Sequence, residues 1–388
     1  MTSKVNKFCI QGGHVLLPSG ETQETDIVIS EGRIDAIGVS PAKTVKRIDA
    51  SGCMVLPGIV DLHGDAFERQ IMPRPGVTFP LELAFLDTDR QLVANGITTG
   101  FHGITYSWEP GLRGRETVIK VLTALRKLSD VLGATTKCHL RFETFNFAAA
   151  DEVVDWISNG EIHFLAFNNH LPSIRKKICE DQPLSQFLER TGLAKIDFLY
   201  LVESLSERES ETTHLIEKLA KTARKNSISM ASHDDKTSTI RQFYNSLGCH
   251  ISEFPLTMKA ITQAYELGNF IVLGAPNIIR GGSHMGKSGL SASRNIKAGM
   301  GDILCSDYYY PALMQAPFNL SENKILDFGS SWRMVSKAPA EAAGLTDRGE
   351  IIEGKRADLI LIEQLDFGER KLKATFVNGS PVYRSCWL

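Results

Sequence analysis

Residues 55–65, VLPGIVDLHGD, lie between two regions of different sequence pattern. Residues 59–62 form a mostly apolar run that predicts a buried β-strand. The run ends in His63 and Asp65, which are two positions apart, so both side chains point the same way in an extended chain. An imidazole and a carboxylate on one side are metal ligands of borderline to hard character. The alternative is a capped strand end followed by a solvated aspartate.

Downstream of this stretch, residues 58–344 alternate short apolar runs with segments of helical periodicity. Leu215, Leu219 and Ala223 recur at helical spacing, and Gly268 follows another such segment as a C-cap. Repeated strand–helix units predict a parallel sheet, and a region of about 290 residues suits an α/β protein with a (β/α)8 barrel. The apolar runs are residues 59–62, 97–101, 138–142, 162–167, 228–231, 270–273 and 302–305.

Both ends of the chain have the pattern of β-structure. Residues 26–38 contain an apolar run, a Glu31-Gly32 turn and a segment that alternates with period two. Near the other end, residues 374–377 lead into Asn378-Gly379, a strong hairpin signal. We therefore expect one small β-sandwich domain from residues 1–57 and 345–388, and a barrel from residues 58–344.

Composition narrows the class of protein. The chain has 388 residues, with 43 Lys and Arg against 45 Asp and Glu, and this balance argues against a nucleic-acid-binding surface. It has no apolar run of about 18 residues, so no membrane helix is expected, and residues 1–7 lack a signal-peptide pattern. The seven cysteines include no CxxC pair, so we expect neither a disulfide framework nor a thiolate zinc site. A reducing cytoplasm is the expected compartment.

Further polar side chains follow the apolar runs of the predicted barrel. Glu143, His170, His233 and Asp307 each come after such a run, and catalytic groups of parallel barrels lie at the carboxyl ends of the strands. One by one they are more often structural residues than ligands. Together with the first His/Asp pair they predict a site for one or two divalent cations. In such a site a carboxylate bridges two ions, and a remaining aspartate, here Asp307, accepts a proton from bound water.

A glycine-rich segment at residues 274–289 carries several cationic side chains. Its backbone N–H groups and positive charge suit phosphate oxygens; a flexible surface loop is the alternative. The spacing superficially fits a nucleotide-binding P-loop, but Gly289 breaks the helix that such a loop needs. The predicted phosphate-binding residues are Arg74, between two prolines, and Arg280, Ser283, His284 and Lys287 within the segment.

The motifs also resemble a known family. Residues 55–63 are similar to the opening of the metal site in the amidohydrolase superfamily. Further motifs resemble the branch of that superfamily formed by the α-D-ribose 1-methylphosphonate 5-triphosphate diphosphatases of the carbon–phosphorus lyase pathway. They are His63-Gly64-Asp65 and residues 72–77 (MPRPGV), 231–235 (ASHDD), 252–255 (SEFP), 274–277 (GAPN), 280–284 (RGGSH) and 306–308 (SDY). The resemblance covers nearly the whole chain.

That resemblance implies a distorted barrel of the amidohydrolase type, a divalent metal centre and hydrolysis of a triphosphate chain to a 5-phosphate plus pyrophosphate. Superfamily members usually open the metal site with His-x-His, whereas this chain has His63-Gly64-Asp65. No lysine stands at a strand end to become a carbamylated bridge, so Glu143 is the preferred bridging residue. Zinc is the expected ion, with manganese, iron and magnesium as alternatives, and the expected substrate is a small phosphorylated ribose phosphonate.

Two other functions stay open at this point. An amidohydrolase-type deacetylase or cyclic-amide hydrolase would apply the same metal chemistry to a carbon centre, but the cationic glycine-rich segment argues against an uncharged substrate. A metal-free, non-catalytic scaffold of the same fold is disfavoured because all the candidate ligands are present. Nucleic acids and membranes are not expected partners, and a homo-oligomer is left open.

Overall fold

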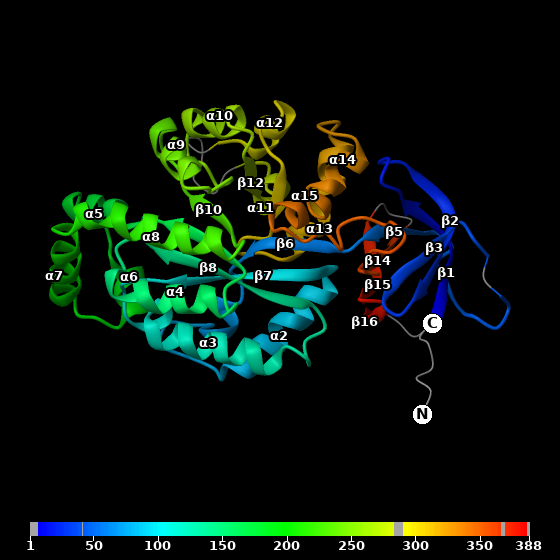
Figure 1. The fold of residues 1–388 in the computed structure, drawn as a ribbon, viewed down its shortest axis with the longest axis horizontal. Coiled ribbons are helices and arrows are strands. Elements are labelled where there is room, and N and C mark those ends of the chain that lie inside the picture. The colour runs from blue at the N-terminus through cyan, green and yellow to red at the C-terminus, as the bar shows by residue number, and fades with distance from the viewer. Residues whose placement is uncertain (1–6, 41, 283–289, 366–368, 386–388) are drawn as a thin grey trace.

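The computed structural model describes residues 7–40, 42–282, 290–365 and 369–385. The chain folds into a barrel with a β domain at one end (Figure 1). In that domain the blue N-terminal strands and the red C-terminal strands lie side by side. Helices α5 (Leu171–Cys179) and α7 (Lys195–Ser206) lie at the opposite end of the molecule.

Eight parallel strands in the described part of the chain form the barrel, in the same order in space as in the sequence. Each strand pairs in parallel with its sequence neighbour. Helices connect them, because a parallel connection needs a crossover. The strands are β6 (Ile59–Gly64), β7 (Ile97–Tyr106), β8 (Thr135–Glu143), β9 (Phe164–Asn168), β10 (Ser229–His233), β11 (Ile251–Glu253), β12 (Phe270–Gly274) and β13 (Ile303–Cys305).

The barrel closes where the chain around its first and last strands meets. The Asp307 N–H donates to the His63 carbonyl, and the Asp65 N–H donates to the Asp307 carbonyl, both at 3.0 Å. Next to these bonds, the buried Asp61 carboxylate accepts hydrogen bonds from the Ser306 N–H at 3.0 Å and the Ser306 hydroxyl at 2.5 Å. The closure therefore places His63, Asp65 and Asp307, which are far apart in the sequence, at one point of the barrel rim.

Farther along this seam, a third segment lies between the two strands. The Val60 N–H donates to the Val335 carbonyl, and the Leu304 N–H donates to the Met334 carbonyl, both at 2.9 Å. Backbone that follows α14 (Phe328–Arg333) thus satisfies polar groups that an open seam would leave unpaired. The inserted segment makes the barrel a distorted one, as the family resemblance implied.

Helices surround the barrel, and each long one buries an apolar stripe. The two periodic segments predicted from the sequence are confirmed as α8 (Thr212–Lys225) and α10 (Met258–Glu266), and Gly268 after α10 has a φ of 66°. Helix α3 (Arg115–Leu128) has a buried apolar stripe of the same kind. No helix in the described ranges has the length and apolar character needed to cross a membrane. The other helices are α1 (Glu68–Ile71), α2 (Leu81–Ala94), α4 (Ala150–Ser158), α6 (Ser185–Thr191), α9 (Ser238–Ser246), α11 (Ala275–Ile279), α12 (Ala292–Lys297), α13 (Pro311–Glu322) and α15 (Lys337–Ala342).

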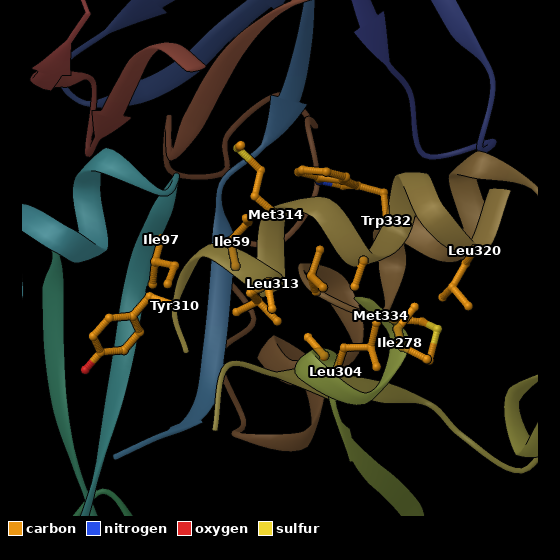
Figure 2. Packing of buried hydrophobic residues seen from close by; sticks show 14 of the residues in the cluster. Ile59, Ile97, Ile278, Leu304, Tyr310, Leu313, Met314, Leu320, Trp332 and Met334 are labelled. Atoms are coloured by element: carbon orange, nitrogen blue, oxygen red, sulfur yellow. The ribbon is translucent and has the colours of Figure 1, made fainter. Parts of the chain in front are cut away.

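Apolar side chains fill the barrel and the space outside its first strands. One cluster takes members from β6, β7 and β9 to β13 and includes Phe164. A second cluster, part of which Figure 2 shows, includes Ile59 of β6, Leu313 of α13 and Trp332 of α14. The buried Trp332 indole N–H donates to the Pro57 carbonyl at 3.0 Å. Burial of each such large apolar side chain contributes about 1.5–3 kcal/mol to the stability of the fold. Packing outside the barrel therefore stabilises the seam.

The β domain combines both ends of the chain in one mixed sheet. Strand β5 pairs in parallel with β1 and antiparallel with β14, which joins the two ends. The predicted hairpin is confirmed, since Asn378 and Gly379 between β15 and β16 have φ values of 49° and 70°. The strands are β1 (Lys7–Leu16), β2 (Thr22–Ser30), β3 (Arg33–Ile37), β4 (Lys46–Asp49), β5 (Cys53–Pro57), β14 (Leu359–Gln364), β15 (Arg370–Val377) and β16 (Ser380–Arg384).

Each of the seven apolar runs overlaps a barrel strand, and the parallel barrel predicted from them is confirmed. The structure adds an eighth strand, β11, which the sequence pattern did not reveal. β11 contains only three residues, too few to show a period or an apolar run.

Candidate metal centre

The predicted ligands gather at the carboxyl ends of the barrel strands. His63 lies near the end of β6, Glu143 ends β8, and His233 ends β10. His170 lies just beyond β9, at the start of α5. Because parallel strands all end on the same side of a barrel, these side chains share one face. The structure adds Glu253, the last residue of β11, to this face.

The first group that could hold a metal ion, here called the inner group, consists of His63, His139 and Glu253. All three are buried, and their ligand atoms lie within 4.8 Å of one another. The His63 Nδ1–H donates to Glu253 Oε1 at 3.2 Å, and His139 Nε2 lies 3.8 Å from Glu253 Oε2. Burial opposes charge on Glu253, but His63 and His139 hold the pKa of this carboxyl well below its usual value. The inner group therefore offers one carboxylate and two imidazoles.

Each imidazole of the inner group has one ring nitrogen without a hydrogen-bond partner among the described residues. His139 donates from Nδ1 to the Leu62 carbonyl at 3.1 Å, and burial lowers its pKa to about 3, so Nε2 carries a lone pair. Among the described residues, neither His63 Nε2 nor His139 Nε2 has a hydrogen-bond partner. Buried polar atoms without partners are rare, whereas metal-binding imidazoles usually donate their other ring N–H to a carboxylate or carbonyl. A divalent cation such as zinc fits this set of donors.

The second group, here called the outer group, consists of His170, His233 and Asp234, which are half-buried. Asp234 lies between the two imidazoles, 3.7 Å from His170 Nε2 and 3.8 Å from His233 Nε2. Burial opposes its charge, but His233 and His170 hold the pKa of Asp234 at about 2. The His233 Nδ1–H donates to Glu253 Oε2 at 3.2 Å. Since Glu253 also accepts from His63, one carboxylate connects the two groups.

Glu143, the predicted bridging residue, pairs with a member of the outer group. Its buried carboxylate accepts hydrogen bonds from His170 Nδ1–H and, at 3.3 Å, from the His170 backbone N–H. The carboxylate raises the pKa of His170 to about 9. Among the described residues, Glu143 belongs to neither group. It orients His170, while Glu253 is the carboxylate in contact with both groups.

Asp65, the second residue of the predicted His/Asp pair, contacts an arginine. Arg141 Nη1–H donates to Asp65 Oδ2 at 2.9 Å, and Arg141 Nη2–H donates to His233 Nε2 at 3.4 Å. Burial opposes the charge on Asp65, but Arg141 holds the pKa of this carboxyl below its usual value. The guanidinium thus places a fixed positive charge beside the outer group, and Asp65 balances that charge.

A cavity of about 510 Å³ opens onto both groups. Asp307 lines it, and so do His63 of the inner group and His233 of the outer group. Asp307 is half-buried and has a φ of 53°. It belongs to neither group, but a molecule held in the cavity would lie beside it.

The predicted phosphate-binding residues lie in different surroundings. Arg280, just after α11, is exposed, and its Nη1–H donates to the Tyr308 hydroxyl at 3.4 Å. Arg74 is exposed as well, and neither arginine is among the described residues that line the cavity. Lys236, which sequence reasoning did not single out, does line it. The remaining predicted residues, Ser283, His284 and Lys287, lie outside the described part of the chain.

Sequence reasoning did not name His139, Asp234 or Glu253 as ligands. A signal for His139 was available, because His139, Arg141 and Glu143 alternate along one strand and such residues point to the same face. Glu253 had no comparable signal, since its strand is too short to be recognised. Both inner-group residues that were missed lie within or at the end of a strand and not in a loop.

The sequence of the chain is similar to sequences of known enzymes. Over 359 residues the chain is 30% identical to the alpha-D-ribose 1-methylphosphonate 5-triphosphate diphosphatase of Escherichia coli strain K12, and the match covers 90% of this chain and 94% of that protein. A stretch of 109 residues, 28% of this chain and 22% of the relative, is 33% identical to an allantoinase of Bacillus licheniformis. No protein-family model matches the chain.

Solved structures share the fold. A crystal structure of a prolidase complexed with N-methylphosphonate-L-proline matches with a TM-score of 0.65 over 98% of this chain and 100% of that chain, at 16% identity. A crystal structure of an amidohydrolase has a TM-score of 0.66 with the same coverage, at 15% identity. At these identities the likeness concerns the fold alone. By this fold and by its full-length similarity to the E. coli diphosphatase, the chain belongs to the amidohydrolase superfamily.

Proposed function

We propose that the chain hydrolyses α-D-ribose 1-methylphosphonate 5-triphosphate to the 5-phosphate and pyrophosphate. The observation that carries the proposal is the 30% identity to a diphosphatase of that name over 90% of the chain. The cavity supports it, because Arg141 and Lys236 line it beside two candidate metal groups. A substrate with several negative charges suits such a cavity.

The inner and outer groups are proposed to hold one or two divalent cations, with zinc as the expected ion. When bound, such a cation would acidify a water molecule and polarise a phosphoryl oxygen. Glu253 is well placed to hold both groups together, because its two carboxylate oxygens accept hydrogen bonds from His63 and His233. Asp65, Glu143 and Asp307 are proposed to complete the site.

The reaction adds water to a phosphorus of the triphosphate and breaks the P–O bond to the pyrophosphate leaving group. Asp307 is proposed to accept the proton of the attacking water at its carboxylate, because it lies in the cavity wall. Arg141 and Lys236 would balance the negative charge that develops on the phosphoryl oxygens. Arg74, Arg280, Ser283, His284 and Lys287 are proposed to bind the outer phosphates.

One assay tests the proposal. Purified protein loaded with Zn²⁺ is incubated with ribose 1-methylphosphonate 5-triphosphate, and pyrophosphate and orthophosphate are measured separately. Pyrophosphate as the first product, and its loss in the presence of a chelator, would support the proposal. Orthophosphate as the first product, or no product with zinc, manganese, iron or magnesium, would contradict it.

A cyclic-amide hydrolase remains the rival function, because part of the chain is similar to an allantoinase. That similarity covers only 28% of the chain. An uncharged cyclic amide would leave the positive charge of Lys236, which lines the cavity, without a substrate partner. The same zinc-loaded protein should therefore show no turnover of allantoin under conditions in which it releases pyrophosphate.

A further inference from the structure

Phe254, the residue directly after β11, has an unusual backbone conformation. Its φ is 50°, in the left-handed region that bulky side chains rarely occupy. Asp234 and Asp307, just beyond β10 and β13, have φ values of 60° and 53°, but the short polar side chain of aspartate tolerates this region better. A phenylalanine there is strained, and strained residues persist most often at functional sites.

The conformation changes the direction of the Phe254 side chain. In a regular strand, successive side chains point to opposite faces, so Phe254 would point away from the cluster that Glu253 contacts. The left-handed residue breaks this alternation, and the Phe254 N–H donates to the Val272 carbonyl at 3.1 Å. The phenyl ring lies edge-on to the His63 and His233 imidazoles, with centroid distances of 5.1 and 5.2 Å.

Two consecutive residues therefore contact the same two imidazoles. The Glu253 oxygens accept the Nδ1–H groups of His63 and His233, each at 3.2 Å. The phenyl ring of Phe254 packs at 83° and 80° to those imidazoles, which stack on each other with centroids 5.3 Å apart. The hydrogen bond selects the tautomer, while the phenyl ring limits the rotation of each imidazole about its terminal side-chain bond, which is otherwise broad.

We propose that Phe254 is a positioning residue whose strained backbone holds the Nε2 atoms of His63 and His233 in place before a metal ion binds. This inference rests on the metal-binding part of the proposed function and does not depend on the identity of the substrate. Ligands that are already oriented bind an ion without losing rotational freedom, which raises affinity. The strain at Phe254 then lowers the stability of the fold and serves metal binding.

The experiment compares Phe254→Gly, Phe254→Leu and Phe254→Tyr in the full chain. Lys324→Gly is the matched control, because Lys324 also has a left-handed φ, 54°, but is exposed and is not among the described residues that line the cavity. For each variant, Zn²⁺ affinity is measured by competition with a chromophoric chelator. The melting temperature of the metal-free protein is measured in parallel.

Phe254→Gly removes the strain and the ring together, so the two effects on stability oppose each other. We expect the melting temperature to stay within about 4 °C of the wild-type value and Zn²⁺ affinity to fall about tenfold to hundredfold, as for residues that orient metal ligands. Phe254→Leu keeps the apolar bulk and should still lose about tenfold. Phe254→Tyr should keep wild-type affinity, and Lys324→Gly should change only the melting temperature.

Wild-type Zn²⁺ affinity in Phe254→Leu would overturn the proposal, because it would reduce the role of the ring to filling space. If Phe254→Gly does not fold, Phe254→Leu alone decides the question. Since Zn²⁺ affinity is measured without any substrate, a failed diphosphatase assay leaves this test valid. Zn²⁺ binding without pyrophosphate release would overturn the proposed reaction and not the role of Phe254.

Discussion

The inner and outer groups use the same kinds of side chain in different surroundings. The side chains of His63, His139 and Glu253 are at most 1% exposed, whereas those of His170 and Asp234 are 33% and 34% exposed. The inner residues belong to strands, while His170 and Asp234 lie beyond the strand ends. Position relative to the end of a barrel strand therefore decides which side chains meet solvent, and His233, the outer-group residue that ends β10, is only 6% exposed.

The two groups also differ in charge. Burial keeps His139 neutral, with a pKa lowered to about 3, whereas Glu143 raises the pKa of His170 to about 9. His139 Nε2 thus has a lone pair ready for a cation, whereas His170 must first release a proton, because a metal-binding imidazole is neutral. The comparison suggests a tightly held ion inside and a more exchangeable one near the solvent.

Glu253→Gln has the largest expected effect, because this carboxylate is the one in contact with both groups. A glutamine amide is neutral and has one acceptor oxygen, so it cannot accept a hydrogen bond from each histidine at a separate oxygen as the carboxylate does. We therefore expect Zn²⁺ affinity to fall about hundredfold or more and pyrophosphate release to stop. Elemental analysis and chelator competition measure the change. Glu341→Gln is the control, since Glu341 is an exposed partner of Arg333. A normal zinc content in Glu253→Gln would contradict this prediction and show that the two groups bind zinc without Glu253.

Asp307→Asn should affect the chemistry without removing the ions. Asp307 lines the cavity but belongs to neither group, and an asparagine keeps one neutral oxygen there that can still contact an ion. We therefore expect zinc content and melting temperature to be retained. Turnover should fall about 10²- to 10⁴-fold, the usual effect of losing a general base. Turnover close to that of the wild type in a well-folded variant would remove Asp307 from the mechanism.

Metal removal tests the difference in exposure between the groups. With a chromophoric chelator in excess, zinc release from the wild type should show a fast phase from the outer group and a slow phase from the inner group. His170→Gln should abolish the fast phase and His139→Gln the slow phase, with affinity losses of about tenfold to hundredfold. A single phase that both variants alter equally would show that the groups form one site.

The smallest expected effects concern the cationic side chains outside the two groups. Lys236→Ala should lower kcat/KM for the triphosphate about tenfold, because a charge-assisted contact contributes about 1.5–3 kcal/mol. Arg280→Ala should lower it less, since Arg280 donates to the Tyr308 hydroxyl and is not among the described residues that line the cavity. Steady-state kinetics of both variants provide the comparison, with Lys225→Ala on α8 as the control. A larger effect at Arg280 would place the phosphates at the glycine-rich segment.

The barrel was predictable because its strands and helices carry long, regular patterns. Helix α8 shows its buried stripe at Leu215, Leu219 and Ala223, and the Asn378-Gly379 hairpin shows its turn residues. His63, His170 and His233 could be proposed as ligands because each follows an apolar run, and the carboxyl ends of parallel strands face one side. For these residues local pattern and barrel geometry agree.

The sequence by itself determined the type of barrel, the β domain shared by both ends and half of the histidine and carboxylate set. Only the tertiary structure decided that Glu253 connects the two groups, because a three-residue strand has no period to read. It also decided that Arg141 lies beside His233 and that Phe254 packs against two imidazoles. These contacts join segments far apart in the chain and depend on barrel closure and on a strained backbone, neither of which a local pattern records.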